Sequence, residues 1–241
     1  MKTAFIFRVL LAALLLGLLT VGCQEDDFTV APEAEQEHIQ AFNVPEIPAE
    51  IAQHFTEEEL ATFQAGPPKE MLEGVESRYG SWHPVVAILE VEFNHRPVTG
   101  TYDEPYICSS VAECPPSAGN WLGYAELYTF EGTWFGMGPV TGGSTGSIHF
   151  FNGQVLPPVK TWMQFGNSEL LFQTAHLSAV NGDDGSIVMI LREDFYGGTG
   201  MFTGAYGYVY VRLYTHVNDL PGLLTGAPGH AYVFDIGWVH Y

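Results

Sequence analysis

The sequence predicts an all-β protein whose strands close into an antiparallel eight-stranded barrel. The first sign is the stretch from Tyr196 to Thr215, where glycines precede a strictly alternating run. A period of two is the pattern of a strand with two different faces, and glycines before it allow a tight barrel corner. The second sign is a composition with 27 glycines and 14% aromatic residues, which suits short strands and tight turns. The third is a series of about eight alternating segments with short connections, enough to close a sheet and remove its edges.

Length and charge narrow the range of functions. At 241 residues the chain can hold one β-domain with extra segments. The formal net charge of −20 excludes a nucleic-acid partner, because phosphate backbones would be repelled. Residues 24–80 hold half of the 28 acidic side chains, so the acidity is concentrated near the N-terminus.

The first 22 residues have the layout of a secretory signal peptide. Lys2 and Arg8 precede an uncharged apolar run over residues 9–21, which is shorter than the roughly 20 residues of a membrane-spanning helix. The run ends in Leu-Thr-Val-Gly-Cys, which resembles the lipobox of bacterial lipoproteins, with Thr20 at the position where leucine is usual. The resemblance implies that Cys23 is lipidated and becomes the mature N-terminus.

An acidic cluster, Gln24 to Asp27, directly follows that cysteine. It resembles the surface-export signal of lipoproteins in Bacteroidetes-type bacteria. The resemblance implies a lipid anchor in the outer membrane, with the protein facing the cell exterior. Residues 23–48 combine acids and prolines with few large apolar residues, so we expect a disordered tether.

Residues 49–80 are expected to form short helices. Thr56 followed by Glu59 has the form of a capping box, and Gly66-Pro67-Pro68 stops the helix. A second short helix is expected over residues 69–77. The glutamates at this helix start are expected to be solvated and are assigned no chemistry.

The β-barrel domain is expected over residues 81–241. In its first strand, Val85, Ala87, Leu89, Val91 and Phe93 face one way. We expect Asn94 to Pro97 to end that strand, residues 97–119 to form a long loop, and residues 132–146 to be rich in turns. The expected strands are Pro84–Phe93, Trp121–Glu131, Ser147–Phe151, Thr161–Phe165, Leu170–Ala179, Ser186–Asp194, Tyr206–Thr215 and Tyr232–Tyr241.

Two cysteines remain once Cys23 is assigned to lipid. In an exported chain, Cys108 and Cys114 are therefore expected to form a disulfide. The competing assignment is a metal site, which we disfavour because no histidine or further cysteine lies at ligand spacing. We expect neither a metal nor another cofactor.

A glycine-rich pattern in the middle of the domain resembles barrels of the allene oxide cyclase and dirigent type. It consists of Thr174–His176, then Ala179–Asp183, then Gly197–Gly207, with Met201 where those proteins often have a basic residue. The resemblance implies an eight-stranded barrel that binds hydrophobic or aromatic small molecules, and some members guide cyclisation or coupling. The shared pattern carries no catalytic residue across.

A candidate pocket can be assembled from tyrosines and charged residues inside predicted strands. Its members are Tyr206, Tyr208, Tyr210, Arg212, Glu90 and Glu126. Tyrosines can stack on aromatic or sugar rings and present hydroxyls. The alternative is that the tyrosines only stabilise their strand and that the charges point outward or pair at a barrel end.

Three functions remain open. The first is a lipid-anchored surface barrel that binds a small hydrophobic, aromatic or glycan ligand without catalysis. The second is an isomerase or cyclase that uses a pocket carboxylate, for which the sequence singles out no catalytic residue. The third is a protein-interaction module, whose sign would be a large exposed apolar patch.

Overall fold

A computed structural model describes residues 42–72, 80–158, 160–219 and 225–241. The expected signal peptide, Cys23, most of the tether and the second half of the helix expected over 69–77 lie outside these residues. The described part belongs to one unit, Phe42–Tyr241. Its helices are α2 (Ala49–Ala52), α3 (Glu57–Gln64) and α4 (Lys69–Leu72), with 3-10 turns η1 (Pro116–Ala118), η2 (Gly200–Phe202) and η3 (Val217–Asp219). None of these helices is long and apolar enough to cross a bilayer.

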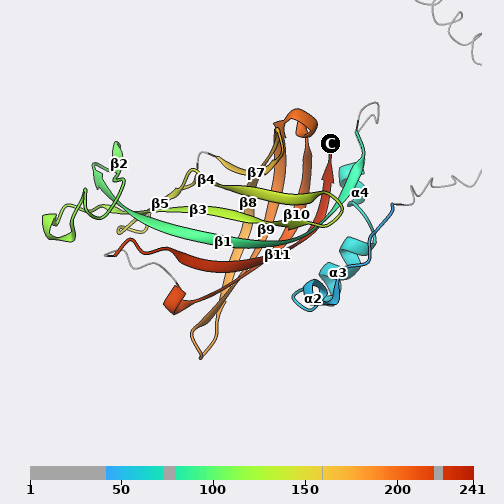
Figure 1. Ribbon diagram of the computed structural model, residues 1–241, viewed down its shortest axis with the longest axis horizontal. Helices are drawn as coiled ribbons and strands as arrows, with labels where there is room; N and C mark the ends of the chain where they lie inside the picture. The colour runs from blue at the N-terminus through green and yellow to red at the C-terminus, as the bar shows by residue number, and fades with distance from the viewer. Residues whose placement is uncertain (1–41, 73–79, 159, 220–224) are drawn as a thin grey trace, which may run out of the picture. The chain divides into compact units, whose positions relative to one another are not determined.

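Eleven strands form one antiparallel sheet. They are β1 (Trp82–Gly100), β2 (Pro105–Ile107), β3 (Gly123–Trp134), β4 (Gly138–Ser144), β5 (Ser147–Phe150), β6 (Val155–Leu156), β7 (Thr161–Phe165), β8 (Ser168–Asn181), β9 (Ser186–Thr199), β10 (Tyr206–His216) and β11 (Gly229–His240). Eight of them make a ring in the order β1-β11-β10-β9-β8-β7-β4-β3, which closes where β3 pairs with β1. The predicted all-β fold with a closed eight-stranded barrel is therefore confirmed. In Figure 1, β8, β9 and β10 run across the direction of β1, β3 and β4.

The interior of the barrel holds the main hydrophobic core. The inward side chains of β1 are Val85, Ala87, Leu89, Val91 and Phe93, the set that alternation placed together. Aromatic rings fill one end, where Phe202 of η2 lies against Phe165 and Tyr241 at centroid distances of 5.2 and 4.8 Å. That end is closed by packing, so access to the interior has to come from elsewhere.

Helices α2 and α3 cover the outer face of β10 and β11. The indole N–H of Trp238 donates a hydrogen bond of 3.0 Å to the carbonyl of Phe63 in α3, and the two rings stack. The expected capping box is present at the start of α3, between Thr56 and Glu59. A second hydrophobic core, which includes Tyr208, Ile236 and Trp238, therefore lies between the helices and the outer face of these strands.

The strands differ from the sequence prediction in several places. Strand β2 forms within residues 97–119, which were expected to be a long loop, and β9 continues past Asp194 to Thr199. Strand β1 does not end at Asn94 to Pro97 but continues to Gly100, and these four residues pair with β3. Pro97 is tolerated because its carbonyl still accepts a hydrogen bond of 2.9 Å from the Cys108 amide. Part of the turn-rich segment 132–146 forms β4, which belongs to the ring.

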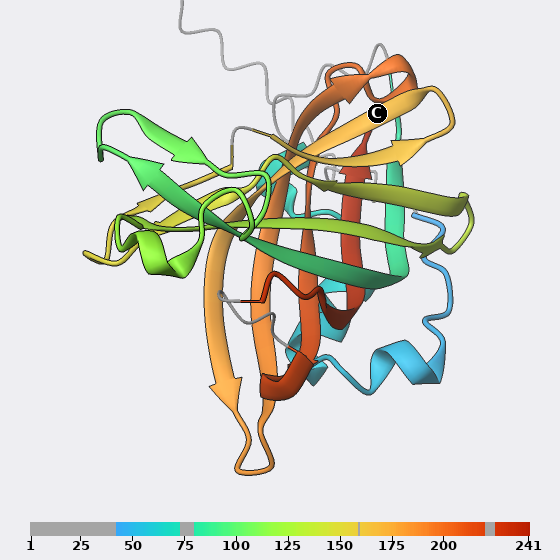
Figure 2. The ribbon, with the colours of Figure 1, turned by 60° about the vertical axis from the view of Figure 1, so that its left-hand side comes forward.

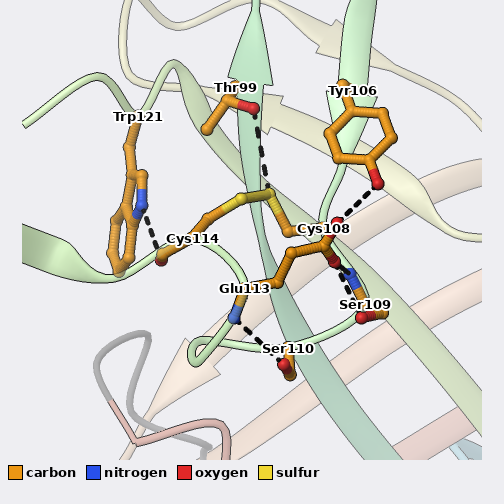
Figure 3. Close-up of a disulfide and its surroundings, with 8 residues drawn as sticks. All are labelled: Thr99, Tyr106, Cys108, Ser109, Ser110, Glu113, Cys114 and Trp121. Atoms are coloured by element: carbon orange, nitrogen blue, oxygen red, sulfur yellow. Dashed lines mark hydrogen bonds between the residues drawn. A yellow bond between two sulfur atoms is a disulfide. The ribbon is translucent and has the colours of Figure 1, made fainter. Parts of the chain in front are cut away.

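The predicted disulfide between Cys108 and Cys114 is confirmed, and it staples the loop after β2 (Figure 3). Glu113 organises this loop, since its carboxylate accepts hydrogen bonds from Ser109 and from the Tyr106 hydroxyl at 2.6 Å. These hydrogen bonds hold the pKa of the Glu113 carboxyl below its usual value. The loop is stabilised locally and lies outside the ring of strands.

Candidate functional site

Two carboxyl groups point into the barrel, and we call Glu193 and Asp235 the interior carboxyl pair. Glu193 on β9 lies opposite Val209, and Asp235 on β11 lies opposite Ala87 and Val211. All three of these neighbours belong to the interior core. Glu193 is 9% exposed and Asp235 is 1% exposed, so both acids are surrounded by apolar side chains. Buried acids of this kind are uncommon, because removing a charge from water is costly.

Burial determines the protonation of the pair. It raises the pKa of Glu193 to about 7, although a hydrogen bond from Thr174 partly opposes the effect. Burial, and then the negative charge of Glu193, raise the pKa of Asp235 well above its ordinary value. Burial therefore favours the protonated form of Asp235, while Glu193 is near the midpoint of its titration at neutral pH.

One atom of the pair has no partner. The Oδ1 atom of Asp235 is buried and makes no hydrogen bond with any described residue. Buried polar atoms in native proteins are nearly always satisfied, so an unpaired one calls for an explanation. An oxygen held without a partner inside an apolar barrel is suited to a ligand that supplies the missing hydrogen bond.

Tyr128 lies on the same inner surface, in a less buried part of it. It faces inward from β3 opposite Phe93 and packs on the interior core while remaining partly exposed. Burial and then the charge of Glu193 raise its pKa, so it stays a neutral phenol, and it hydrogen-bonds to Thr161 and Ser144. It gives the inner wall a second polar group.

A further polar group, which we call the Glu126 cluster, continues the inward row of β3 to the part of the strand that pairs with β5. It consists of Tyr124, Glu126, His95 and His149. The Oε2 atom of Glu126 lies 3.6 Å from Nε2 of His95 and 3.8 Å from Nε2 of His149. The ring of Tyr124 lies 4.8 Å from that of His95 and 5.0 Å from that of His149, centroid to centroid. Glu126, a predicted pocket residue, therefore belongs to the inner surface at the less buried side.

Four other predicted pocket residues lie on the outside of the barrel. Tyr206, Tyr208, Tyr210 and Arg212 share one face of β10, and this face lies toward the helices. Arg212 is 5% exposed and donates a hydrogen bond of 2.6 Å to Glu59 of α3. Its charge holds down the pKa of Glu59, together with the Thr56 hydrogen bonds, although burial alone would raise it. Arg212, Tyr208 and Tyr210 thus join the helices to the barrel. Tyr206 packs instead against Trp82 and His240.

Glu90 lies in a different place again. It lines an external groove of about 610 Å³ together with Glu131, which is its direct neighbour across β1 and β3. Apolar residues such as Ile88 and Phe135 complete the wall. The structure thus distributes the predicted pocket residues over three locations, and only Glu126 faces inward.

The interior carboxyl pair was missed by sequence reasoning, although a signal for it exists. Along β11 the residues 231, 233, 235, 237 and 239 are Ala, Val, Asp, Gly and Val. One acid in an otherwise apolar alternate row marks an inward charge once the inward face is known. Within the described residues, no group of three or more His, Cys, Asp and Glu side chains could hold a metal ion.

Comparisons with known proteins identify no family for this chain, so its function has to be inferred from the residues described above. No protein-family model matches the chain, and no curated protein or solved structure matches it.

Proposed function

We propose that this protein is a lipid-anchored surface barrel that binds a small, mostly apolar ligand in its interior. The observation that carries the proposal is the interior carboxyl pair, in which Asp235 has an unpartnered oxygen amid an apolar lining. Apolar walls with a few polar groups are typical of small-molecule sites. A glycan is the less suitable ligand, because most of its hydroxyl groups would lose hydrogen bonds to water in such a lining.

Access to the interior is proposed from the side of Tyr128. Tyr128, Leu191 and Leu213 belong to the inward rows but are only partly buried. The opposite end is closed by aromatic rings around Phe202. A ligand that enters from the partly exposed side meets Tyr128 first and Glu193 behind it.

The charge state of the pair defines the class of ligand. In the protonated form that burial favours, Asp235 can donate a hydrogen bond and accept one, and Glu193 can do either near pH 7. The site therefore suits an uncharged aromatic or aliphatic molecule with one hydroxyl or carbonyl group. An anionic ligand would be repelled by Glu193 when that group is ionised.

Two fluorescent probes test this proposal. 2-Naphthol and naphthalene have the same ring system, but only 2-naphthol has a hydroxyl. We expect 2-naphthol to bind at least tenfold more tightly to the wild-type chain, and Glu193→Gln to change that ratio. Glu131→Gln, an exposed carboxylate on the outer surface, is the control and should leave both affinities unchanged. Equal affinities for the two probes, or no binding of either, would refute the proposal.

A second candidate function is an isomerase or cyclase, and one observation favours it. A carboxyl with a pKa near 7 beside a protonated acid has the properties of a general base next to a hydrogen-bond donor. Glu193 would remove a proton from an apolar substrate and return it elsewhere, while Asp235 would stabilise the oxygen that gains negative charge.

The assay follows from the resemblance to allene oxide cyclases. The chain is incubated with an unsaturated fatty-acid epoxide, and cyclic ketones are separated by chromatography. Turnover that falls at least a hundredfold in Glu193→Gln, but not in Glu131→Gln, would establish the enzyme. Binding without turnover would leave the non-catalytic barrel as the function.

The lipid anchor is proposed from Cys23 and the acidic residues that follow it. More than one acyl chain makes such anchoring stable. In a bacterial host, the N-terminal peptide of the mature chain should begin at Cys23 and carry the mass of acyl groups. Cys23→Ser should abolish both the acylation and the partitioning into detergent. A mature chain that keeps residues 1–22 would refute this part of the proposal.

A further inference from the structure

One strand of the barrel has an unpaired edge along most of its length. Strand β8 pairs with β9 from Glu169 to Asn181, but it pairs with β7 only from Ser168 to Leu171. Among the described residues, no strand pairs with the other edge of β8 beyond that point. In Figure 2 the hairpin of β8 and β9 projects away from the rest of the barrel. A row of backbone N–H and C=O groups is therefore left without a strand partner.

The side chains along this edge are exposed and apolar in part. Every residue from 173 to 181 is exposed. Leu177 is 58% exposed and Val180 is 57% exposed, and they lie opposite Leu191 and Val188 of β9. The hairpin thus presents apolar side chains on both of its faces next to unpaired backbone groups.

Natural sheets usually protect such an edge with charged residues, prolines or bulges. From Leu170 to Gly182 the sequence has neither a charged residue, apart from the titratable His176, nor a proline. The protective features are two irregularities of register, between Leu171 and Phe172 and between Thr174 and His176. The six residues from His176 to Asn181 are regular and unprotected.

We propose that this edge pairs with the same edge of a second copy of the chain. Two copies of the same strand edge can pair in the antiparallel direction when a two-fold axis perpendicular to the sheet relates them. The axis then places the backbone N–H groups of one copy opposite the C=O groups of the other. The charge supports self-pairing at this place. With a net charge of −20, two copies repel each other, and contact is least unfavourable where neither copy carries an acid.

The occupant is a second copy rather than a charged peptide, because a basic or acidic strand would find no charge of opposite sign on residues 170–182. Self-pairing also predicts a salt effect of a definite sign. Added salt screens the repulsion between the two acidic chains and should strengthen the association. The proposal is independent of what the barrel interior binds.

Sedimentation equilibrium of the full chain, with hydrogen exchange at several concentrations, tests the proposal. We expect a monomer–dimer equilibrium below about 1 mM. Those amides of residues 176–181 that point away from β9 should gain protection as the concentration rises. Val180→Lys should weaken the dimer at least tenfold. Val155→Lys is the matched control, because Val155 is 55% exposed and lies on β6, at the other end of the sheet.

Leu177→Lys is the second variant and should act like Val180→Lys, with an unchanged far-UV circular dichroism spectrum in both. A chain that stays monomeric up to that concentration would overturn the proposal. So would dimerisation that only Val155→Lys abolishes, since that result would assign the contact to β6. Concentration-independent protection of the amides of residues 176–181 that point away from β9 would also overturn it, because another segment of the same chain would then cover the edge.

Discussion

Glu193→Gln should stabilise the folded protein, and the gain should depend on pH. The pKa of Glu193 is about 7 in the folded state against 4.5 for an ordinary glutamate. Between these two values the folded protein keeps a proton that the unfolded chain has released. The free energy of unfolding therefore falls as the pH rises through this window, and the full loss is reached above pH 7.

The size of the effect follows from the two pKa values. They differ by about 2.5, and one pKa unit corresponds to about 1.4 kcal/mol, so ionisation of Glu193 costs about 3 kcal/mol of stability above pH 7. Glutamine cannot ionise and nearly preserves the shape of the side chain. The difference in free energy of unfolding between variant and wild type should therefore be about 3 kcal/mol more favourable at pH 8 than at pH 4.

Urea denaturation of both proteins at pH 4 and pH 8 measures this difference. Comparing the two pH values cancels any effect of the amide group that does not depend on pH. Glu131→Gln is the control, and its difference should be close to zero because that carboxylate is exposed on the outer surface. If the effect of Glu193→Gln were the same at both pH values within about 1 kcal/mol, the side chain would not be buried as an acid in the barrel.

Three further variants probe the helices and the disulfide-closed loop. Glu59→Gln keeps the capping box but removes the charge opposite Arg212. The free energy of unfolding, measured by urea denaturation, should therefore fall by about 3 kcal/mol. A fall below about 0.5 kcal/mol would argue against a buried ion pair. Trp238→Phe removes the hydrogen bond to the carbonyl of Phe63 in α3. The free energy of unfolding should fall by about 1–2 kcal/mol in the same assay. An unchanged free energy of unfolding would contradict this hydrogen bond. Replacing Cys108 and Cys114 by alanine should cost about 2 kcal/mol, because they close a short loop with a sequence separation of 6. A reductant should produce a similar loss in the wild type and none in that variant.

Alternation predicted the strands well because it depends only on local geometry. The row from Val85 to Phe93 and the alternation of β10 are both present in the structure. The closed ring was predicted from the number of strands and their short connections. The capping box and the disulfide were equally local features, and both were found.

The inward face could not be chosen from alternation alone. On β10 one row is Tyr206, Tyr208, Tyr210, Arg212 and Tyr214, and the other is mostly small or aliphatic. Both rows contribute buried residues, Val209 and Val211 inside the barrel and Tyr208 and Arg212 on the side of α2 and α3. The tyrosine row was assigned to a pocket because the sequence does not show that helices cover it. The interior carboxyl pair was missed for the same reason.

Helices α2 and α3 also determine how far the chain can be truncated from its N-terminus. A fragment that starts at residue 81 would keep every strand of the ring, yet it would uncover Trp238 and Tyr208, which are each 1% exposed in the intact protein. Phe42, near the start of the compact unit, already lies edge-on against the Trp238 ring at 5.5 Å. An expression fragment should therefore start before Phe42. A shorter fragment would expose an aromatic surface through which its copies would aggregate.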